Sequence, residues 1–430
     1  MRLGLGMMSA LLAMAGTPAG AGEQAPAPRQ ADGKLADGAL WRATIPENWN
    51  GTLLLWSHGY SPVRGETAED GPAAHRAALL AQGYALAGST YADGGWALES
   101  AVPDQLDTLA AFEARFGKPK RVIAWGMSMG ALVTTAIAER APRRVDGGLA
   151  LCGSIGGAIG MMNMALDGAY AFRTLVAPDA GIRLVRTGDD RENAGRVTAA
   201  LKHAQASPAG RARVALVGVL AGLPGWTTPG SPQPAPADYA AQQSEMAKSV
   251  AMGVFLPRGD QESRAGGVFS WNTGMDYAAQ LKKSGREAMV RALYREAGID
   301  LDADLASLAN GARISADPGA VAYMVSHYTP NGKPLAPVVA VQMMGDGLTS
   351  PSLQQAYADA AKASGKGALV KALWVVGAGH CNFPTPVVLA SLSYLGERLD
   401  TRRWPAVPAT FVPHTPPPML RPCVRGKPCR

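Results

Sequence analysis

The chain has 430 residues, of which 47% are hydrophobic and 17% are charged. This composition is typical of a globular protein with a large buried core, and it excludes a disordered or fibrous chain. The formal net charge is +7, yet lysine and arginine are scattered along the sequence rather than clustered. We therefore expect no nucleic-acid partner, and the length predicts a core domain that carries a substantial insertion.

The first 21 residues have the pattern of a secretory signal peptide. Arg2 is followed by the apolar run 3–15 and then by small residues that end in Ala19-Gly20-Ala21. A basic start, a short apolar stretch and an A-x-A-like end predict cleavage after Ala21. The apolar run is too short for a membrane anchor, and no later segment is long enough without charge. We expect a secreted or periplasmic protein without stable membrane anchoring.

Short apolar strands alternate with helices up to residue 154. This alternation predicts parallel βαβ units, with helices on both faces of one sheet. The predicted strands span residues 40–45, 51–57, 84–90, 121–125 and 148–152, and the predicted helices span residues 73–82, 101–116 and 131 to about 145.

After Gly153 the alternation stops, and helical segments dominate as far as residue 335. They include residues 160–174, 196–206, 239–251 and 275–283, with a Pro/Gly-rich loop at 222–236. Alternation resumes with predicted strands 338–344 and 369–376 and predicted helices 353–363 and 386–399. We therefore predict a signal peptide (1–21), a core (22–154 and 336–404), a helical cap (155–335) and a proline-rich tail (405–430) extended over the surface.

Gly126-Met127-Ser128-Met129-Gly130 is a G-x-S-x-G sequence between a predicted strand and a predicted helix. A nucleophilic serine needs this strand-to-helix turn, and a side chain at either glycine would collide with neighbouring backbone. The new helix would point the Met129 N–H at negative charge that develops beside the serine. A chance match in a glycine-rich chain is the alternative, but the flanking elements favour a nucleophile.

A serine nucleophile needs a base, and the base needs a third group that fixes its tautomer. In sheets of this type the chain order is serine, acid, histidine. Asp346 follows the predicted strand 338–344, and His380 follows the next one in Gly379-His380-Cys381. Among the six histidines only His380 combines that position with a glycine-lined loop. The alternative for Asp346 is an ordinary turn aspartate.

A second backbone donor is expected from the loop after strand 51–57, which reads Ser57-His58-Gly59-Tyr60. We predict an oxyanion hole made by the N–H groups of Tyr60 and Met129, with His58 shaping the loop.

Substrate contacts are predicted for Trp96, Met127 and Met161, because an aromatic ring and thioethers suit an adaptable apolar wall. The same residue types are also ordinary core filler.

The four cysteines predict two disulfides, for which three pairings exist. Cys423 and Cys429 are close in sequence and are expected to pair locally. That leaves Cys152 to join Cys381, beside the candidate histidine. The alternative is that Cys152 is a buried thiol.

Together these residues resemble the α/β-hydrolase superfamily over about residues 40–154 and 336–400: the pair His58-Gly59, the turn at Ser128, Asp346 and His380. The resemblance implies an α/β-hydrolase fold with the cap inserted between the strand after the serine helix and the acid strand. It also implies attack of Ser128 on a carbonyl, an acyl-enzyme, and no metal or organic cofactor.

The pair His380-Cys381 is similar to half of the arrangement in tannase-type feruloyl esterases. In those enzymes a disulfide joins the residue before the serine to the residue after the histidine. Here Met127 precedes the serine, so that arrangement is absent.

Three functions follow as hypotheses. The favoured one is hydrolysis of small or medium-sized carboxylic esters, and the others are a serine peptidase or amidase on the same triad and a non-catalytic binding protein. A peptidase normally needs an anchor for the substrate amine or carboxylate. No acidic pair in the cap stands out as that anchor, although Asp260 and Glu262 are candidates. The acidic run 300–304 superficially suggests a calcium loop but lacks its glycine and glutamate, and a helix start is expected there.

Overall fold

The computed structural model describes residues 29–188 and 190–429. The predicted signal peptide, residues 1–21, lies outside the described residues. Eight strands form one sheet in the order β1-β2-β4-β3-β5-β6-β7-β8. Strand β2 pairs antiparallel with β1 and β4, and the remaining pairs are parallel. The strands are β1 (Arg29–Lys34), β2 (Leu40–Ile45), β3 (Thr52–Ser57), β4 (Ala85–Ser89), β5 (Arg121–Met127), β6 (Gly147–Leu151), β7 (Val338–Gly345) and β8 (Val370–Ala378).

This strand order and the crossing helices confirm the α/β-hydrolase fold. The inner strands β3, β4 and β6 are buried along their whole length, as expected for parallel strands covered on both faces. That burial explains why their sequences are almost continuously apolar.

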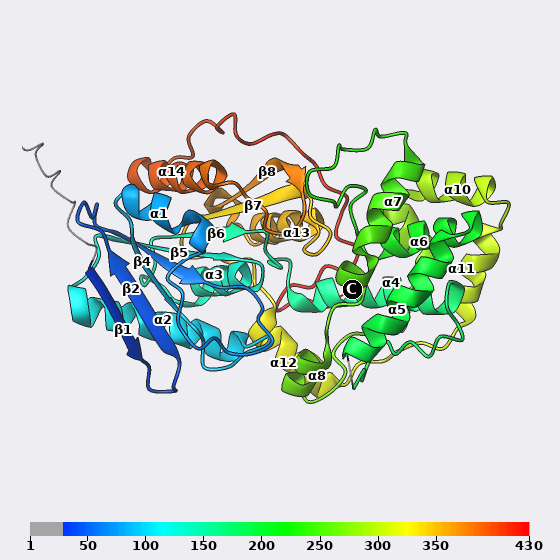
Figure 1. The fold of residues 1–430 in the computed structure, drawn as a ribbon, viewed down its shortest axis with the longest axis horizontal. Helices are drawn as coiled ribbons and strands as arrows, with labels where there is room; N and C mark the ends of the chain where they lie inside the picture. The colour runs from blue at the N-terminus through cyan, green and yellow to red at the C-terminus, as the bar shows by residue number, and fades with distance from the viewer. Residues whose placement is uncertain (1–28, 189, 430) are drawn as a thin grey trace, which may run out of the picture.

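Helices cover both faces of the sheet (Figure 1). Helices α1 (Ala73–Ala81) and α14 (Thr385–Thr401) contact each other and share one apolar cluster with the sheet. The other face carries α2 (Leu98–Phe116), α3 (Met129–Arg140) and α13 (Pro351–Ala363). Helix α3 ends at Arg140 and not near residue 145 as predicted, because Pro142 disfavours helical backbone at Ala141.

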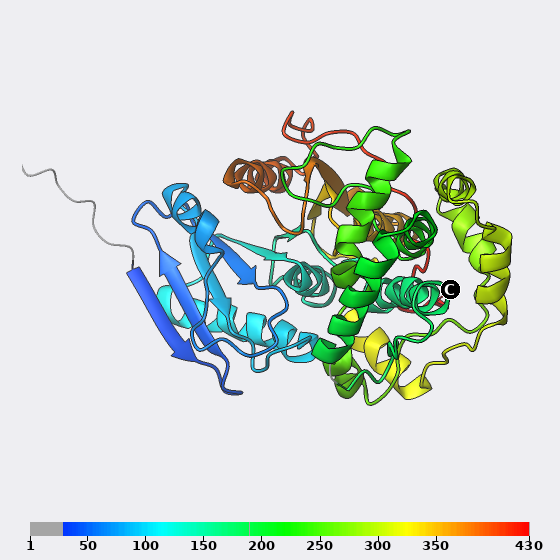
Figure 2. The ribbon, with the colours of Figure 1, turned by 45° about the vertical axis from the view of Figure 1, so that its right-hand side comes forward.

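The chain between β6 and β7 is mainly helical and stands to one side of the sheet (Figures 1 and 2). Its cluster of buried apolar residues runs from Leu166 to Leu308, so this region has a core of its own. Asp300 caps a helix by accepting the N–H groups of Asp302 and Ala303, which confirms the predicted helix start. The helices are α4 (Ala158–Leu175), α5 (Asp190–Gln205), α6 (Pro208–Leu220), α7 (Tyr239–Ser249), α8 (Gly259–Ala265), α9 (Tyr277–Lys283), α10 (Glu287–Glu296), α11 (Leu301–Asn310) and α12 (Pro318–Tyr328), and a π turn follows α7 at Val250–Val254.

The tail differs from the prediction that it extends over the surface. It has no helix or strand within residues 402–429, but Met419, Leu420, Arg421 and Cys423 are buried. Val412 forms a bridge with Trp374 on the edge strand β8. From there the tail crosses to the helical region, where the C-terminus lies (Figures 1 and 2). The prediction was wrong for residues 419–423, because the guanidinium of Arg421 finds a buried acidic partner, Asp167.

Both predicted disulfides, Cys152–Cys381 and Cys423–Cys429, are present. Over the described residues, no helix combines the length and the apolar character needed to cross a bilayer.

Candidate active site

Ser128 occupies a sharp turn between β5 and α3. Its backbone has φ 57° and ψ −123°, a conformation that is energetically unfavourable for a residue other than glycine. Strained residues of this kind cluster at functional sites. A Cβ at Gly126 would overlap the carbonyl oxygen of Gly130, and a Cβ at Gly130 would overlap that of Ser57. The predicted collisions at both glycines are therefore present. The turn needs glycine on each side to bring strand, helix and neighbouring loop this close.

His380 links the serine to the acid. Its Nε2 lies 2.9 Å from Ser128 Oγ, and its Nδ1 lies 2.9 Å from Asp346 Oδ2. The Asp346 side chain is fully buried, whereas the imidazole is 24% exposed. The structure thus brings together the three predicted side chains from the ends of β5, β7 and β8, with the imidazole accessible from outside.

The Asp346 carboxylate accepts hydrogen bonds from other groups besides the imidazole. The N–H groups of Leu348 and Thr349 both donate to Oδ1 at 2.9 Å. The Thr349 hydroxyl lies 2.9 Å from Oδ2, 2.8 Å from the Cys152 carbonyl oxygen and 3.3 Å from His380 Nδ1. Sequence reasoning missed Thr349. The available signal was its position three residues after the acid, within the same loop.

The loop after β3 passes directly beside the serine. A Cβ built on Gly59 would lie 3.2 Å from Ser128 Cβ, so this loop approaches the nucleophile at backbone distance. Tyr60 is the next residue, and its side chain is 36% exposed. Met129 is the first residue of α3, where a backbone N–H has no partner within its own helix.

His58 holds this loop and is not part of the serine–histidine pair. Its ring stacks on Tyr91 at 4.0 Å, and its Nδ1 lies 2.7 Å from the Gly59 carbonyl oxygen. The Tyr91 hydroxyl donates to the His58 carbonyl oxygen at 3.1 Å. Burial raises the pKa of Tyr91, so this hydroxyl keeps its proton. The loop-shaping role predicted for His58 agrees with these contacts.

The disulfide fastens the histidine loop to the strand beside the serine. Cys152 follows β6, whose Leu151 carbonyl accepts the Ser128 N–H. Cys381 Sγ lies 3.4 Å from His380 Nε2. The bond therefore joins the loop that carries the imidazole to the end of β6, which is hydrogen-bonded to the serine turn.

The three predicted substrate contacts are all largely buried, at 8% exposure for Trp96, 9% for Met127 and 5% for Met161. Met127 and Met161 belong to apolar clusters of the core. The Trp96 ring lies 5.9 Å from the ring of Tyr60, beside the loop next to the serine. Their part in substrate binding stays a prediction.

The two candidate anchors for a substrate amine are already engaged. Asp260 accepts the Trp96 N–H at 2.7 Å and pairs with Arg264 at 3.1 Å. Glu262 accepts the Arg186 N–H at 2.7 Å and lies 3.7 Å from Arg258. Both carboxylates thus bind groups of the protein itself.

No model of a known protein family matches the chain. A curated relative, described as an o-phthalyl amidase of Xanthobacter agilis, is 30% identical over 408 residues. The aligned region covers 87% of this chain and 88% of the relative.

Solved structures give more distant likenesses. An esterase of Pyrococcus furiosus has 14% identity and a TM-score of 0.39, covering 88% of this chain and 92% of its own. Feruloyl esterase B of Aspergillus oryzae has 13% identity and a TM-score of 0.41, covering 86% and 80%. An acylaminoacyl peptidase of Pyrococcus horikoshii has 12% identity and a TM-score of 0.39, covering 88% and 42%.

Proposed function

Because the chain belongs to the α/β-hydrolase superfamily, in the same family as the Xanthobacter agilis amidase, we propose that it hydrolyses carboxylic esters through Ser128, His380 and Asp346. The observation that supports this most directly is the hydrogen-bonded series Ser128 Oγ–His380–Asp346, with 2.9 Å at each step. This is the geometry in which an imidazole can remove a proton from a serine hydroxyl.

In the first half of the reaction, His380 Nε2 takes the Ser128 proton as Oγ attacks the substrate carbonyl. Asp346, bonded to Nδ1, fixes the tautomer and stabilises the imidazolium that forms. The N–H groups of Met129 and Tyr60 donate hydrogen bonds to the oxyanion. Each such donor stabilises the transition state by about 3 to 4 kcal/mol.

The imidazolium then returns its proton to the leaving alcohol, and the acyl group stays on Ser128. In the second half, His380 removes a proton from water as the water oxygen attacks the acyl carbon. The bond from that carbon to Ser128 Oγ then breaks, the imidazolium returns its proton to Oγ, and the acid leaves. Side chains, backbone N–H groups and water carry every step of this scheme.

Amide hydrolysis on the same three residues is the second candidate. The relative that is 30% identical is described as an o-phthalyl amidase, and the same acyl-enzyme forms when the leaving group is an amine. The amine must be protonated as it leaves, a step that His380 is equally placed to perform.

The test compares the wild-type enzyme with Ser128→Ala on p-nitrophenyl esters of increasing acyl length and on an o-phthalyl amide. We expect turnover by the wild type and loss of about 10⁴-fold or more in Ser128→Ala. Ser326→Ala, at an exposed position of α12, should behave like the wild type. Equal activity of Ser128→Ala and wild type on every substrate would contradict both candidates and favour a binding protein. Activity confined to the amide would replace the ester proposal.

We also propose that the protein is exported and that residues 1–21 are removed. Two disulfides within the described residues support an oxidising compartment. Mass spectrometry of the mature protein from the producing cells should give an N-terminus at Gly22, and a cytoplasmic protein that begins at Met1 would contradict the proposal.

A further inference from the structure

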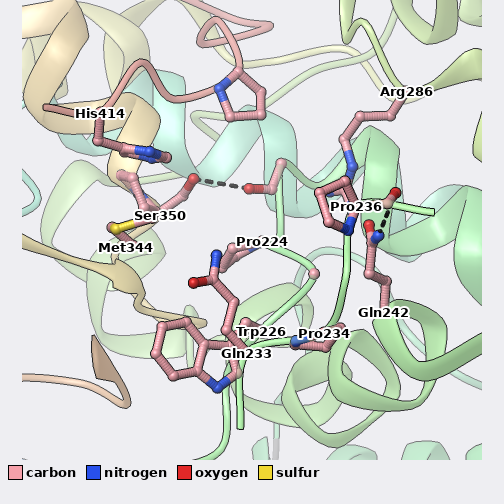
Figure 3. Close-up of a pocket in the computed structure, with 14 residues that line it drawn as sticks. Pro224, Trp226, Gln233, Pro234, Pro236, Gln242, Arg286, Met344, Ser350 and His414 are labelled. Atoms are coloured by element: carbon pink, nitrogen blue, oxygen red, sulfur yellow. Dashed lines mark hydrogen bonds between the residues drawn. The ribbon is translucent and has the colours of Figure 1, made fainter. Parts of the chain in front are cut away.

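A cavity of about 210 Å³ lies where the loop after α6, the acid loop and the tail meet. Figure 3 shows Arg286 and Gln242 on one side of it, Ser350, Met344 and His414 on the opposite side, and Trp226 below. Neither Ser128 nor His380 lines this cavity. The cavity therefore borders the acid loop through Met344 and Ser350 but does not contain the serine or the histidine.

The guanidinium of Arg286 lacks an acidic partner. One amino group donates to the Leu223 carbonyl oxygen, and the other faces the sulfur atoms of Met246 and Met289 at 3.3 and 3.7 Å. Thioether sulfur is a weak acceptor. Within residues 29–188 and 190–429, no carboxylate lies in ion-pair distance of Arg286.

A half-buried cation of this kind is unusual, because buried charges are normally paired. Burial lowers the pKa of Arg286 to about 10, so the group remains charged at neutral pH. The Arg286 guanidinium therefore offers the cavity one full positive charge and N–H donors that have no strong acceptor.

The other walls are flat and mostly apolar. Trp226 Nε1 already donates to Ser231, so its ring can offer the cavity apolar surface. Pro224 and Pro236 add rigid apolar surface. Burial lowers the pKa of His414, so it adds no second charge at neutral pH. The walls suit a ligand with a planar apolar ring and one negative charge.

We propose that this cavity binds a small aromatic monocarboxylate. Arg286 receives the carboxylate through two parallel N–H···O bonds, the geometry that a guanidinium favours. The aromatic ring lies against Trp226 and the prolines. Since a cavity of about 150 Å³ holds benzene, the volume here suffices for one ring and its carboxylate. The inference does not depend on the activity proposed for Ser128.

The test uses benzoate as the probe and calorimetry on the full-length Ser128→Ala protein, in which the nucleophile is absent. We expect millimolar binding, weakened about tenfold or more when Arg286→Gln is added. Arg291→Gln is the matched control, because Arg291 lies on α10, the helix that Arg286 precedes as its N-cap, and already pairs with Glu287 at 2.7 Å. Benzamide, which has the same ring without the charge, should bind more weakly than benzoate.

Equal benzoate affinity with and without the Arg286 guanidinium would overturn the proposal, as would no binding up to about 10 mM. A crystal soaked with 4-bromobenzoate gives a second readout that needs no variant at Arg286. An anomalous bromine peak between Arg286 and Trp226 supports the site. A peak only beside residue 128, or none, overturns it.

Discussion

The acid of the proposed triad is held by four donors. Two backbone N–H groups fix Asp346 Oδ1, while the Thr349 hydroxyl and His380 Nδ1 share Oδ2. These contacts fix the orientation of the Asp346 carboxylate toward the imidazole. In the proposed mechanism Thr349 is therefore a positioning residue, which acts on His380 through Asp346.

Removal of the Thr349 hydroxyl should slow catalysis. We expect Thr349→Val to lower kcat about tenfold with little change in KM, because substrate binding does not involve this buried side chain. Thr349→Ser keeps the hydroxyl and should restore most of the rate. Steady-state kinetics and the pH dependence of kcat on a p-nitrophenyl ester give the readout. Equal kcat values in Thr349→Val and wild type would assign the hydroxyl to packing alone.

Replacement of two helix glycines by alanine should change the stability of the fold in opposite directions. A Cβ at Gly130 would overlap the Ser57 carbonyl, whereas a Cβ at Gly396 in α14 has nothing within 4 Å. We expect Gly396→Ala to stabilise by about 0.5–1 kcal/mol and Gly130→Ala to destabilise by about 3 kcal/mol or more. Thermal unfolding followed by circular dichroism measures both. An unchanged Tm in Gly130→Ala would show that the turn can relax.

At the scale of the elements, a pair of acids joins the β1–β2 turn to α2. Asp104 on α2 is fully buried, accepts the Ala92 N–H at 2.8 Å, and lies near Asp37 of the turn. Burial, together with Asp37, raises the pKa of Asp104 to about 8. The pair therefore holds a proton at neutral pH.

This proton gives the fold a pH dependence of defined sign. Between about pH 4 and pH 8 the folded chain keeps a proton that the unfolded chain has lost. Stability from this group is therefore greatest at low pH and decreases as pH rises toward 8. Asp104→Asn resembles the protonated form, so its Tm relative to wild type should increase between pH 5 and pH 8. A constant difference in Tm would show that Asp104 is ionised throughout.

The elements that the sequence predicted best are those with a strong apolar pattern. The inner strands and the helices beside them lie within a few residues of their predicted positions. Strand β1 was missed because its sequence, RQADGK, is polar, and pairing with β2 at the sheet edge decides its conformation. Helices α6, α8, α10 and α12 were not predicted, and of α11 only the start was, although the region was correctly described as helical.

The site could be predicted where one local pattern carries it. The G-x-S-x-G turn, the chain order of acid and base, and the cysteine spacing each lie within a few residues or follow a topological rule. Thr349 was missed because its one sequence signal, a position three residues after the acid, is shared by ordinary turn threonines, and only its three-dimensional contacts distinguish it. The cavity beside Arg286 could not be predicted either, since its walls come from segments that are remote in sequence.

At the scale of the whole molecule, the tail connects the sheet to the helical region between β6 and β7. Arg421 is fully buried, pairs with Asp167 of α4 at 2.8 Å, and donates to the Trp271 carbonyl oxygen at 3.0 Å. The burial of Arg421 could not be predicted from the sequence, because a tail rich in proline and arginine is usually exposed. The residues farthest along the chain thus help to hold the helical region.

Loss of the Arg421 charge should weaken the whole fold. Arg421→Met leaves Asp167 buried without its partner, and we expect a cost of about 3 to 5 kcal/mol. The double variant Asp167→Asn/Arg421→Met removes both charges and should cost less. Urea unfolding measures the free energies, with the exposed Arg402→Met as control. A double variant less stable than Arg421→Met would rule out the unpaired charge as the cause.

The place of the insertion also sets the order in which the sheet can be completed. Strand β6 ends at Leu151, and its parallel partner β7 begins only at Val338. At about 5–20 residues per second, a ribosome needs roughly 10 to 40 s to travel between them. During that interval the apolar edge of β6 has no neighbour and Cys152 has no partner. Any vectorial emergence, from a ribosome or across a membrane, therefore delivers Ser128 long before Asp346 and His380, together with an unpaired apolar strand edge that is prone to aggregation.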